Sequence, residues 1–309
     1  MPKSPGVETQ LSAAYQFLNS LDLSSAEETL HEALKDDFED ETLLFAMKCS
    51  AWWADAMAKS ESLCCHFESG EYIISKWKVF RSSVQHFGVP DLRTLAAFKQ
   101  FAFGSALSHY SSIASETEEP ELAFRLGRAS KGYGDYEKAV QWLEAATKAK
   151  RDDPALLAEL ADVYSLIDQA RASKALFREA YFINPQQIDW ELLESAIISA
   201  LIEKARSLGK EGFELSEWIP VLAELSGVFS VKRELKPIEV GKLKQSIYEA
   251  ETELATDGSR RCILVPRLIN RYFWLIDHYL NKKEEKSKID ELLLKIKLLD
   301  PLVYKQYIS

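Results

Sequence analysis

Histidine and cysteine are the side chains of this sequence best suited to metal or nucleophile chemistry, and their spacing indicates neither. No two histidines lie three or four residues apart, the separation that places two ligands on one helix face. The five are His31, His66, His86, His109 and His278. The cysteines, Cys49, Cys64, Cys65 and Cys262, match no zinc or redox motif. We expect them to be small buried or half-buried helix residues in a reducing compartment.

Cys65 and His66 are neighbours, which is compatible with an activated thiol, although a buried cysteine beside a linker histidine is the simpler interpretation. The recurring phosphate-binding, dinucleotide-binding, metalloprotease and hydrolase motifs do not occur in the sequence. We therefore expect no catalytic residue, no metal ligand and no cofactor, and we predict that the protein is not an enzyme.

Charge and hydropathy narrow the range of partners. The net charge of −10 argues against nucleic acid, because phosphate binding requires a basic face. No stretch reaches the roughly 18 apolar residues of a membrane span, and the N-terminus has no apolar signal segment, so we expect a cytoplasmic protein without membrane insertion. Residues 1–60 carry 11 acidic and 4 basic side chains, whereas residues 231–309 carry 12 and 16. This polarity is suited to steering a partner or ordering an assembly, but ordinary solvated helix faces are the preferred interpretation.

The elements that position these residues are predicted to be helices. Only 12 Gly and 10 Pro occur in 309 residues, which means few turns and argues against a many-stranded β fold. Outside the two segments described next, helices are expected at 41–58, 71–86, 91–114, 187–207, 215–230, 237–255, 262–281 and 285–299. The acidic segment 115–120 is expected to end one of them.

The clearest pattern is a repeat of 34 residues, because segments 120–153 and 154–187 align without a gap. The first segment contains Leu126-Gly127, the turn Gly134-Asp135-Tyr136, and Ala139, Leu143 and Ala146. The second contains Leu160-Ala161, Tyr164, Ser173, Phe177, Ala180 and Pro185. Small residues at these positions let two antiparallel helices approach closely, and the large ones fill the space between successive pairs.

These residues resemble the tetratricopeptide repeat (TPR) family, whose period is 34 residues. The resemblance is specific over about 120–187, and segment 7–40 fits it loosely through Ala13-Ala14, Phe17, Ala26, Leu30 and Ala33. It implies an all-α fold, a right-handed α–α superhelix of antiparallel helix pairs (a TPR-like α-solenoid). We expect three regions: divergent repeats over 1–115, two repeats over 116–187, and a C-terminal helical extension over 188–309 that packs on the repeats.

The family binds partners through a concave groove lined by the first helix of each pair. Carried over to this sequence, the resemblance places Glu121, Phe124, Arg125, Arg128, Lys131, Asp162 and Ser165 in or beside that groove. The carboxylate clamp of some members is not reproduced, since Ala158 and Asp162 stand where it needs cationic or amide donors. The cations favour an acidic or amphipathic helical segment of a partner protein.

Most of the seven tryptophans are expected to fill the core. Adjacent residues on a helix point about 100° apart, so each of the runs Trp52-Trp53 and Tyr272-Phe273-Trp274 is expected to bring at least one ring to a surface or groove. Trp52, Trp53 and Trp274 are therefore candidate docking aromatics.

We predict a protein–protein interaction scaffold or adaptor that binds through a TPR-type groove or through its helical edges. A structural subunit of a larger multiprotein assembly is the alternative. A regulatory or supporting domain of an enzyme is a third hypothesis, and an RNA-binding helical repeat is a fourth that the acidic charge disfavours.

Overall fold

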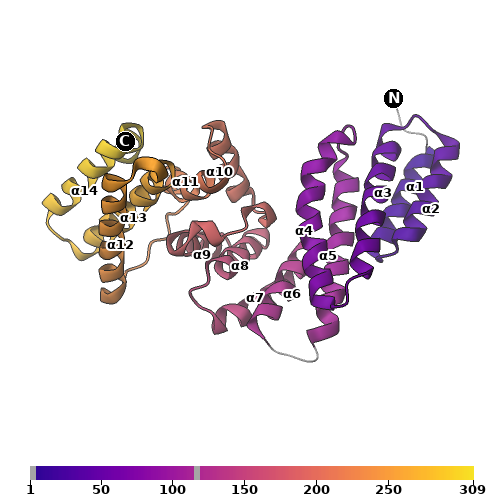
Figure 1. Ribbon diagram of the computed structural model, residues 1–309, viewed down its shortest axis with the longest axis horizontal. Coiled ribbons are helices and arrows are strands. Elements are labelled where there is room, and N and C mark those ends of the chain that lie inside the picture. Colours follow the sequence, from indigo (N-terminus) through magenta and orange to yellow (C-terminus); the bar gives the residue numbers. More distant parts are fainter. Residues whose placement is uncertain (1–4, 115–118) are drawn as a thin grey trace. The chain divides into compact units, whose positions relative to one another are not determined.

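The computed structural model describes residues 5–114 and 119–309, and these residues form fifteen α-helices with a few short 3₁₀ turns and no β-strand (Figure 1). The predicted all-α class is confirmed. Residues 115–118 of the acidic break expected at 115–120, together with the predicted region boundary at 115/116, lie outside the described residues.

None of the helices described combines the length and the apolar character needed to cross a lipid bilayer.

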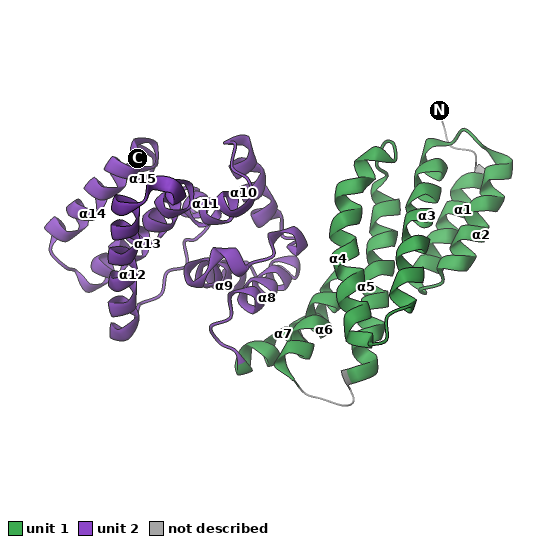
Figure 2. Ribbon diagram, viewed as in Figure 1, with its two compact units in different colours: residues 1–149 green, residues 150–309 purple. Residues whose placement is uncertain are grey.

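The chain divides into two compact units, residues 1–149 and 150–309 (Figure 2). The division falls near the end of the first 34-residue segment, just before the second segment begins. In the first unit the described helices are α1 (Pro5–Asn19), α2 (Leu23–Asp36), α3 (Glu41–Glu61), α4 (His66–Ser83), α5 (Leu92–Ala114), α6 (Pro120–Tyr133) and α7 (Tyr136–Ala149). In the second they are α8 (Pro154–Leu166), α9 (Ala170–Ile183), α10 (Ala196–Ser207), α11 (Gly212–Leu225), α12 (Pro237–Thr256), α13 (Arg261–Lys282), α14 (Lys286–Leu299) and α15 (Pro301–Ile308).

In the first unit each helix packs on the next, and α1 also packs on α5. The Tyr15 hydroxyl of α1 lies 2.7 Å from the Thr94 hydroxyl of α5. The core between α3, α4 and α5 is aromatic: Trp53 is fully buried, and its ring packs against those of Trp77 and Phe101 at centroid distances of 6.5 and 6.1 Å. The additional α1–α5 contact closes these helices into a bundle.

In the second unit α11 and α13 are the central helices. α11 contacts α9, α10, α13 and α15, whereas α13 contacts α11, α12 and α14. The Tyr272, Phe273 and Trp274 side chains of α13 are all buried. The Phe273 ring stacks on Tyr307 at 4.4 Å, and the Trp274 ring stacks on Phe182 at 4.1 Å. One apolar core thus joins α9, α13 and α15.

Three helix hairpins have the same turn at the fifteenth residue of the segments that begin at 7, 120 and 154. That residue is left-handed in each, with φ of 65° at Leu21, 102° at Gly134 and 61° at Asp168. The following N–H donates to the carbonyl five residues earlier: Asp22 to Phe17 (2.9 Å), Asp135 to Ser130 (2.9 Å) and Gln169 to Tyr164 (2.8 Å). A left-handed residue with this bond ends a helix and reverses the chain, so the three hairpins have a common connection.

The same three hairpins bury side chains at equivalent positions. The residues of the second helices are Ala26, Leu30 and Ala33 in the first hairpin, Ala139, Leu143 and Ala146 in the second, and Ser173, Phe177 and Ala180 in the third, and all are essentially inaccessible to solvent. Small, large and small residues therefore recur at the same places in the packing of each pair, as the sequence register predicts.

The predicted helix 187–207 is wrong over its first part. Residues 188–195 form only a short 3₁₀ turn, Trp190–Leu192, and α10 begins at Ala196. The Asp162 carboxylate explains this departure, because it accepts hydrogen bonds from the backbone N–H groups of Glu194 (2.9 Å) and Ser195 (2.8 Å). These two N–H groups bond a side chain of α8 and not a carbonyl of their own segment, and α10 begins directly after them.

Candidate protein-binding surfaces

The predicted groove residues of the first unit lie on α6, and several of them are engaged within that unit. Arg125 donates to Glu71 of α4 (2.8 Å) and to Glu121 (2.5 Å). The Phe124 ring is 7% exposed, with the Arg125 and Arg128 guanidinium carbons 5.1 and 4.4 Å from its centroid. The structure thus brings Glu121, Phe124, Arg125 and Arg128 together, at a face that α4 partly covers.

Lys131 is 1% exposed, although it is charged. The next residue, Gly132, faces α5, where a β-carbon built on it would lie 2.2 Å from the Phe103 ring. With this exposure Lys131 is not an open groove residue, whereas Glu121 and Arg128 on the same helix remain partly exposed. In the second unit Asp162 is buried beneath residues 194–195, while Ser165 at the end of α8 is partly exposed.

The three candidate docking aromatics are packed to different extents. Trp53 and Trp274 are core residues of their own units, while Trp52 keeps partial exposure beside Phe80 at a centroid distance of 5.1 Å. No ring of the run Tyr272 to Trp274 reaches the surface. Helices on three sides of α13 explain why residues pointing about 100° apart are all buried.

Three leucines of α14 and α15 have exposed side chains. Leu294 and Leu298 lie one turn apart on α14, Leu302 lies in the first turn of α15, and they are 55%, 75% and 73% exposed. On the other side of α14, Leu292 and Ile296 enter the core. We call Leu294, Leu298 and Leu302 the leucine edge. The i, i+4 spacing of Leu294 and Leu298 was visible in the sequence, but sequence alone did not say which leucines face the core.

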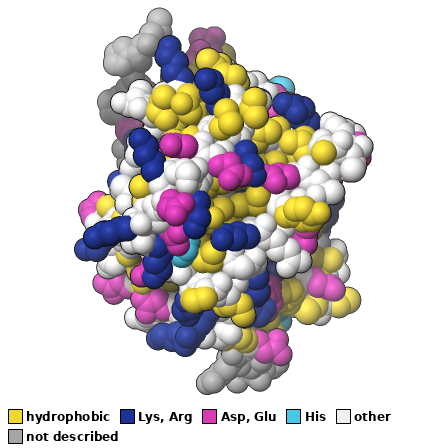
Figure 3. Space-filling model, turned by 90° about the vertical axis from the view of Figure 1, so that its left-hand side faces the viewer, with side chains coloured by type: hydrophobic (Ala, Val, Ile, Leu, Met, Phe, Trp, Pro, Cys, Tyr) yellow, Lys and Arg dark blue, Asp and Glu magenta, His cyan; other side chains and the backbone are white. Residues whose placement is uncertain are grey.

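Cations accompany the leucine edge. Lys297 and Lys305 are exposed, and the Lys297 ammonium lies 5.5 Å from the centre of the Tyr304 ring. Figure 3 looks onto the end of the second unit that carries α14, and it shows hydrophobic side chains on that face with both basic and acidic side chains among them. Apolar side chains bordered by lysines suit an amphipathic helix whose polar side is acidic.

His66 and His109 come together from α4 and α5, across 43 residues of sequence. Their Nδ1 atoms are 3.0 Å apart, so one ring donates a hydrogen bond to the other. Burial lowers the pKa of His109, and the neighbouring His66 lowers it further. In the described part of the chain no group of three or more His, Cys, Asp or Glu side chains is arranged to hold a metal ion. Sequence spacing contains no signal for a pair so far apart.

The expectation that all four cysteines are buried or half-buried helix residues is wrong for three of them. All four cysteines are free thiols, but only Cys49 is buried, and burial raises its pKa to about 12. Cys64 and Cys65 are exposed because they lie in the connection between α3 and α4, and Cys262 is exposed in the first turn of α13.

A buried charge cluster in the second unit joins α9, α11 and α13. Arg178 donates to Asp277 and lies 3.7 Å from Glu224, while Lys232 contacts Asp277 at 2.5 Å and Glu224 at 3.0 Å. The Arg178 guanidinium also lies 4.0 Å from the centre of the Trp274 ring. Burial raises the pKa of Glu224 despite both cations. Two cations and two carboxylates balance each other, which is an arrangement for holding helices together.

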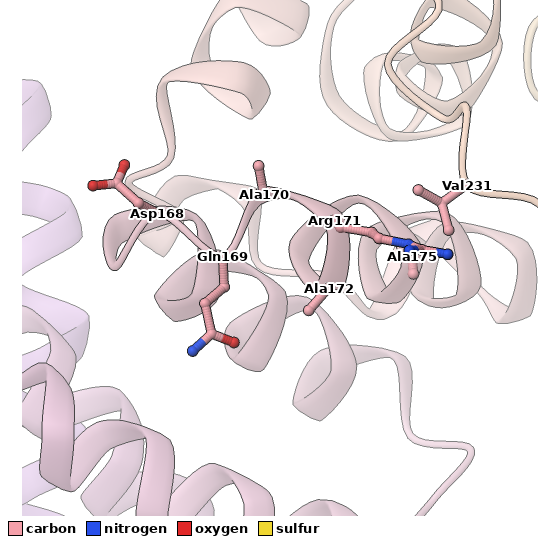
Figure 4. Close-up of a pocket in the computed structure, with 7 residues that line it drawn as sticks. All are labelled: Asp168, Gln169, Ala170, Arg171, Ala172, Ala175 and Val231. Carbon is pink, nitrogen blue, oxygen red and sulfur yellow. The ribbon is translucent and has the colours of Figure 1, made fainter.

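An open depression of about 610 Å³ lies beside the start of α9 (Figure 4). Three alanines line much of it, namely Ala170, Ala172 and Ala175. The Arg171 side chain extends toward Val231, whereas the Asp168 and Gln169 side chains point in different directions (Figure 4). The polar groups do not converge on one point, so we assign no ligand to this depression.

No protein-family model matches this sequence, and no curated protein matches it.

Proposed function

We propose that this chain is a helical-repeat scaffold of the TPR type that binds another protein through the leucine edge on α14 and α15. The repeat part of the proposal is supported by the three hairpins, whose left-handed turn residues and buried small–large–small positions recur at equivalent places. A right-handed superhelix of such hairpins is the architecture that this register favours.

The single observation that carries the binding part is the exposure of Leu294, Leu298 and Leu302. Each of these leucines has more than half of its surface in water, although burying one fully is favourable by about 1.5–3 kcal/mol. A partner that covers them recovers this free energy. The α6 face supports binding less well, because Phe124 is almost covered and Lys131 is buried.

The partner is proposed to be a protein segment that forms an amphipathic helix with an acidic polar side. Its apolar side would cover the leucine edge, and its carboxylates would lie near Lys297 and Lys305. This agrees with the acidic or amphipathic segment expected from the sequence, and it moves the contact from the concave groove to a helical edge.

Site-specific photo-crosslinking tests the proposal. A photoreactive residue at position 298 should capture a partner, which is then purified and its affinity for the intact chain measured. Leu298→Asp should weaken binding at least about tenfold, because an ionised carboxylate would be buried at the contact. Leu92→Asp is the matched control: Leu92 is 80% exposed at the start of α5 in the first unit, and this variant should bind normally.

Two results would change the proposal. If the purified partner binds Leu298→Asp as tightly as the parent, the leucine edge is not its site. If position 298 crosslinks only to a second copy of this chain, and Leu298→Asp dissolves an oligomer seen by light scattering, the chain is a self-assembling structural subunit. That outcome would favour the alternative function over the adaptor.

A further inference from the structure

A small cavity in the second unit is lined by an arginine that forms no ion pair with any described residue. The cavity has a volume of about 270 Å³ and lies between the end of α9 with the turn that follows it, α11 and α13. Its lining includes Gln186, Glu217, Arg267, Asn270 and Arg271. Such a space is large enough for a ligand of the size of one amino acid, and several of its lining side chains are polar or charged.

The first arginine of the cavity is fully paired. Arg267 donates to the buried Glu217 from both Nε (3.1 Å) and Nη2, and Gln186 adds a hydrogen bond from Nε2 at 2.8 Å. All of these hydrogen bonds end on Oε1 of Glu217, and Arg267 is the cation that forms an ion pair with this carboxylate among the described residues.

The second arginine has no such partner. Arg271 donates from Nη1 to the backbone oxygen of Ser246 at 2.8 Å, and within the described residues it forms no ion pair. Its Nε and Nη2 make no hydrogen bond there and remain accessible to solvent. Burial lowers the pKa of Arg271 and Arg267 lowers it further, while Glu217 and Glu249 act in the opposite direction.

A half-buried guanidinium without a counter-ion is costly, and proteins retain such a group where an anion completes the site. The two N–H groups left open on Arg271 are fixed in one plane, the geometry that binds both oxygens of a carboxylate. Asn270, which is 7% exposed, makes only one long contact of 3.4 Å from Nδ2 to the Tyr181 carbonyl, so its amide is a further polar group at the site.

We propose that this cavity binds a carboxylate monoanion through Arg271, with Asn270 beside it. One uncompensated positive charge next to the paired Glu217 favours a single negative charge over a dianionic phosphate. This ligand site is separate from the leucine edge and does not depend on the proposed scaffold function. The carboxylate belongs either to a free small molecule of amino-acid size or to an acidic side chain of a polypeptide, and the chemistry recognised is the same.

Thermal shift and calorimetric titrations with simple probes test the proposal. N-acetylalanine, which carries the carboxylate, should raise the melting temperature of the unaltered chain and bind saturably. N-acetylalaninamide, which has the same shape without the charge, should bind at least about tenfold more weakly. Inorganic phosphate and a short peptide with one glutamate and blocked ends complete the series.

Variants locate the site. Arg271→Gln should abolish the response to N-acetylalanine, and Arg271→Lys should weaken it, since lysine keeps the charge but loses the planar fork. Arg171→Gln is the matched control, because Arg171 is an exposed arginine of the same unit that lines the other depression. It should bind like the parent.

Each outcome is decisive. Carboxylate binding that Arg271→Gln removes supports the site, and preference for the free compound or for the blocked peptide identifies the source of the carboxylate. If no carboxylate probe binds, if the amide binds equally, if phosphate binds more tightly, or if Arg271→Gln binds like the parent, the proposal is wrong. The comparison of N-acetylalanine with its amide uses the unaltered chain, so it holds even if a variant fails to fold.

Discussion

Gly127 of α6 lies directly against Leu143 of α7: a β-carbon built on Gly127 would be 2.5 Å from the Leu143 Cγ and 3.3 Å from the Ala139 carbonyl oxygen. Real side chains do not approach so closely, so these two helices pack at a distance that only glycine allows. The contact joins two positions that the 34-residue pattern had singled out independently, one small and one large.

Gly127→Ala should therefore destabilise the chain by about 1–3 kcal/mol through overpacking. Leu143→Ala alone should cost about 2–5 kcal/mol by leaving a cavity. In the Leu143→Ala background the added methyl has room, and Gly127→Ala should become neutral or stabilising by up to about 1 kcal/mol, because alanine is the better helix former. Urea unfolding of the four chains measures this coupling. Additive effects would mean that the two residues do not touch.

Local patterns predicted much of this fold. The segments predicted to begin at Pro120 and Pro154 do begin helices there, and the predicted turn at Gly134 ends α6. The small–large–small series identified which side of α7 and α9 is buried. These features depend on neighbours in the chain, and that is why sequence alone reveals them.

The candidate sites were predicted less well, because they depend on distant residues. Lys131 was placed in an open groove, yet it is only 1% exposed. His66 meets His109 across 43 residues, and Arg267 meets Glu217 across 50. No spacing rule links positions so far apart, so the Arg271 cavity could not be found before the helices were placed.

Charge reversal distinguishes a buried Lys131 from an open groove residue. An exposed lysine would tolerate Lys131→Glu with little change in stability, but a carboxylate at a position that is 1% exposed should cost at least about 3 kcal/mol. Lys148→Glu, at an exposed position in the last turn of α7, should cost no more than about 1 kcal/mol. Similar melting temperatures for the two variants would restore the groove as a binding surface.

The buried charge cluster should respond strongly to the loss of one member. Arg178→Met leaves Asp277 and Glu224 facing only Lys232, so we expect a loss of about 3–5 kcal/mol in the free energy of unfolding. Arg233→Met removes a partly exposed arginine that pairs with Glu179 and Glu239, and it should cost about 1 kcal/mol or less.

A double variant tests whether lost charge balance is the reason why Arg178→Met destabilises the chain. In Arg178→Met combined with Asp277→Met, Lys232 and Glu224 remain as one cation and one anion. The double variant should therefore be more stable than the sum of the two single effects predicts. Strict additivity, measured by denaturant unfolding of all four chains, would show that the cluster members act separately.

The His66–His109 pair makes the first unit sensitive to pH. One imidazole must donate and the other accept across the 3.0 Å between their Nδ1 atoms. When both rings are protonated, both nitrogens carry hydrogens and the two cations repel. The lowered pKa of His109 expresses the same preference of the folded chain for a neutral ring, and burial is its largest cause.

Because the folded pKa of His109 lies below the ordinary 6.5, the unfolded chain binds more protons just below that pH. The stabilisation is therefore fully present above pH 6.5 and is lost as the pH falls through the lowered pKa. We expect the melting temperature of the parent to fall from pH 7.5 to pH 5.5 more steeply than that of His109→Gln, which cannot titrate there. His86→Gln is the matched control, since His86 is exposed, and it should follow the parent. Parallel curves for the parent and His109→Gln would show that the pair does not govern stability in this range.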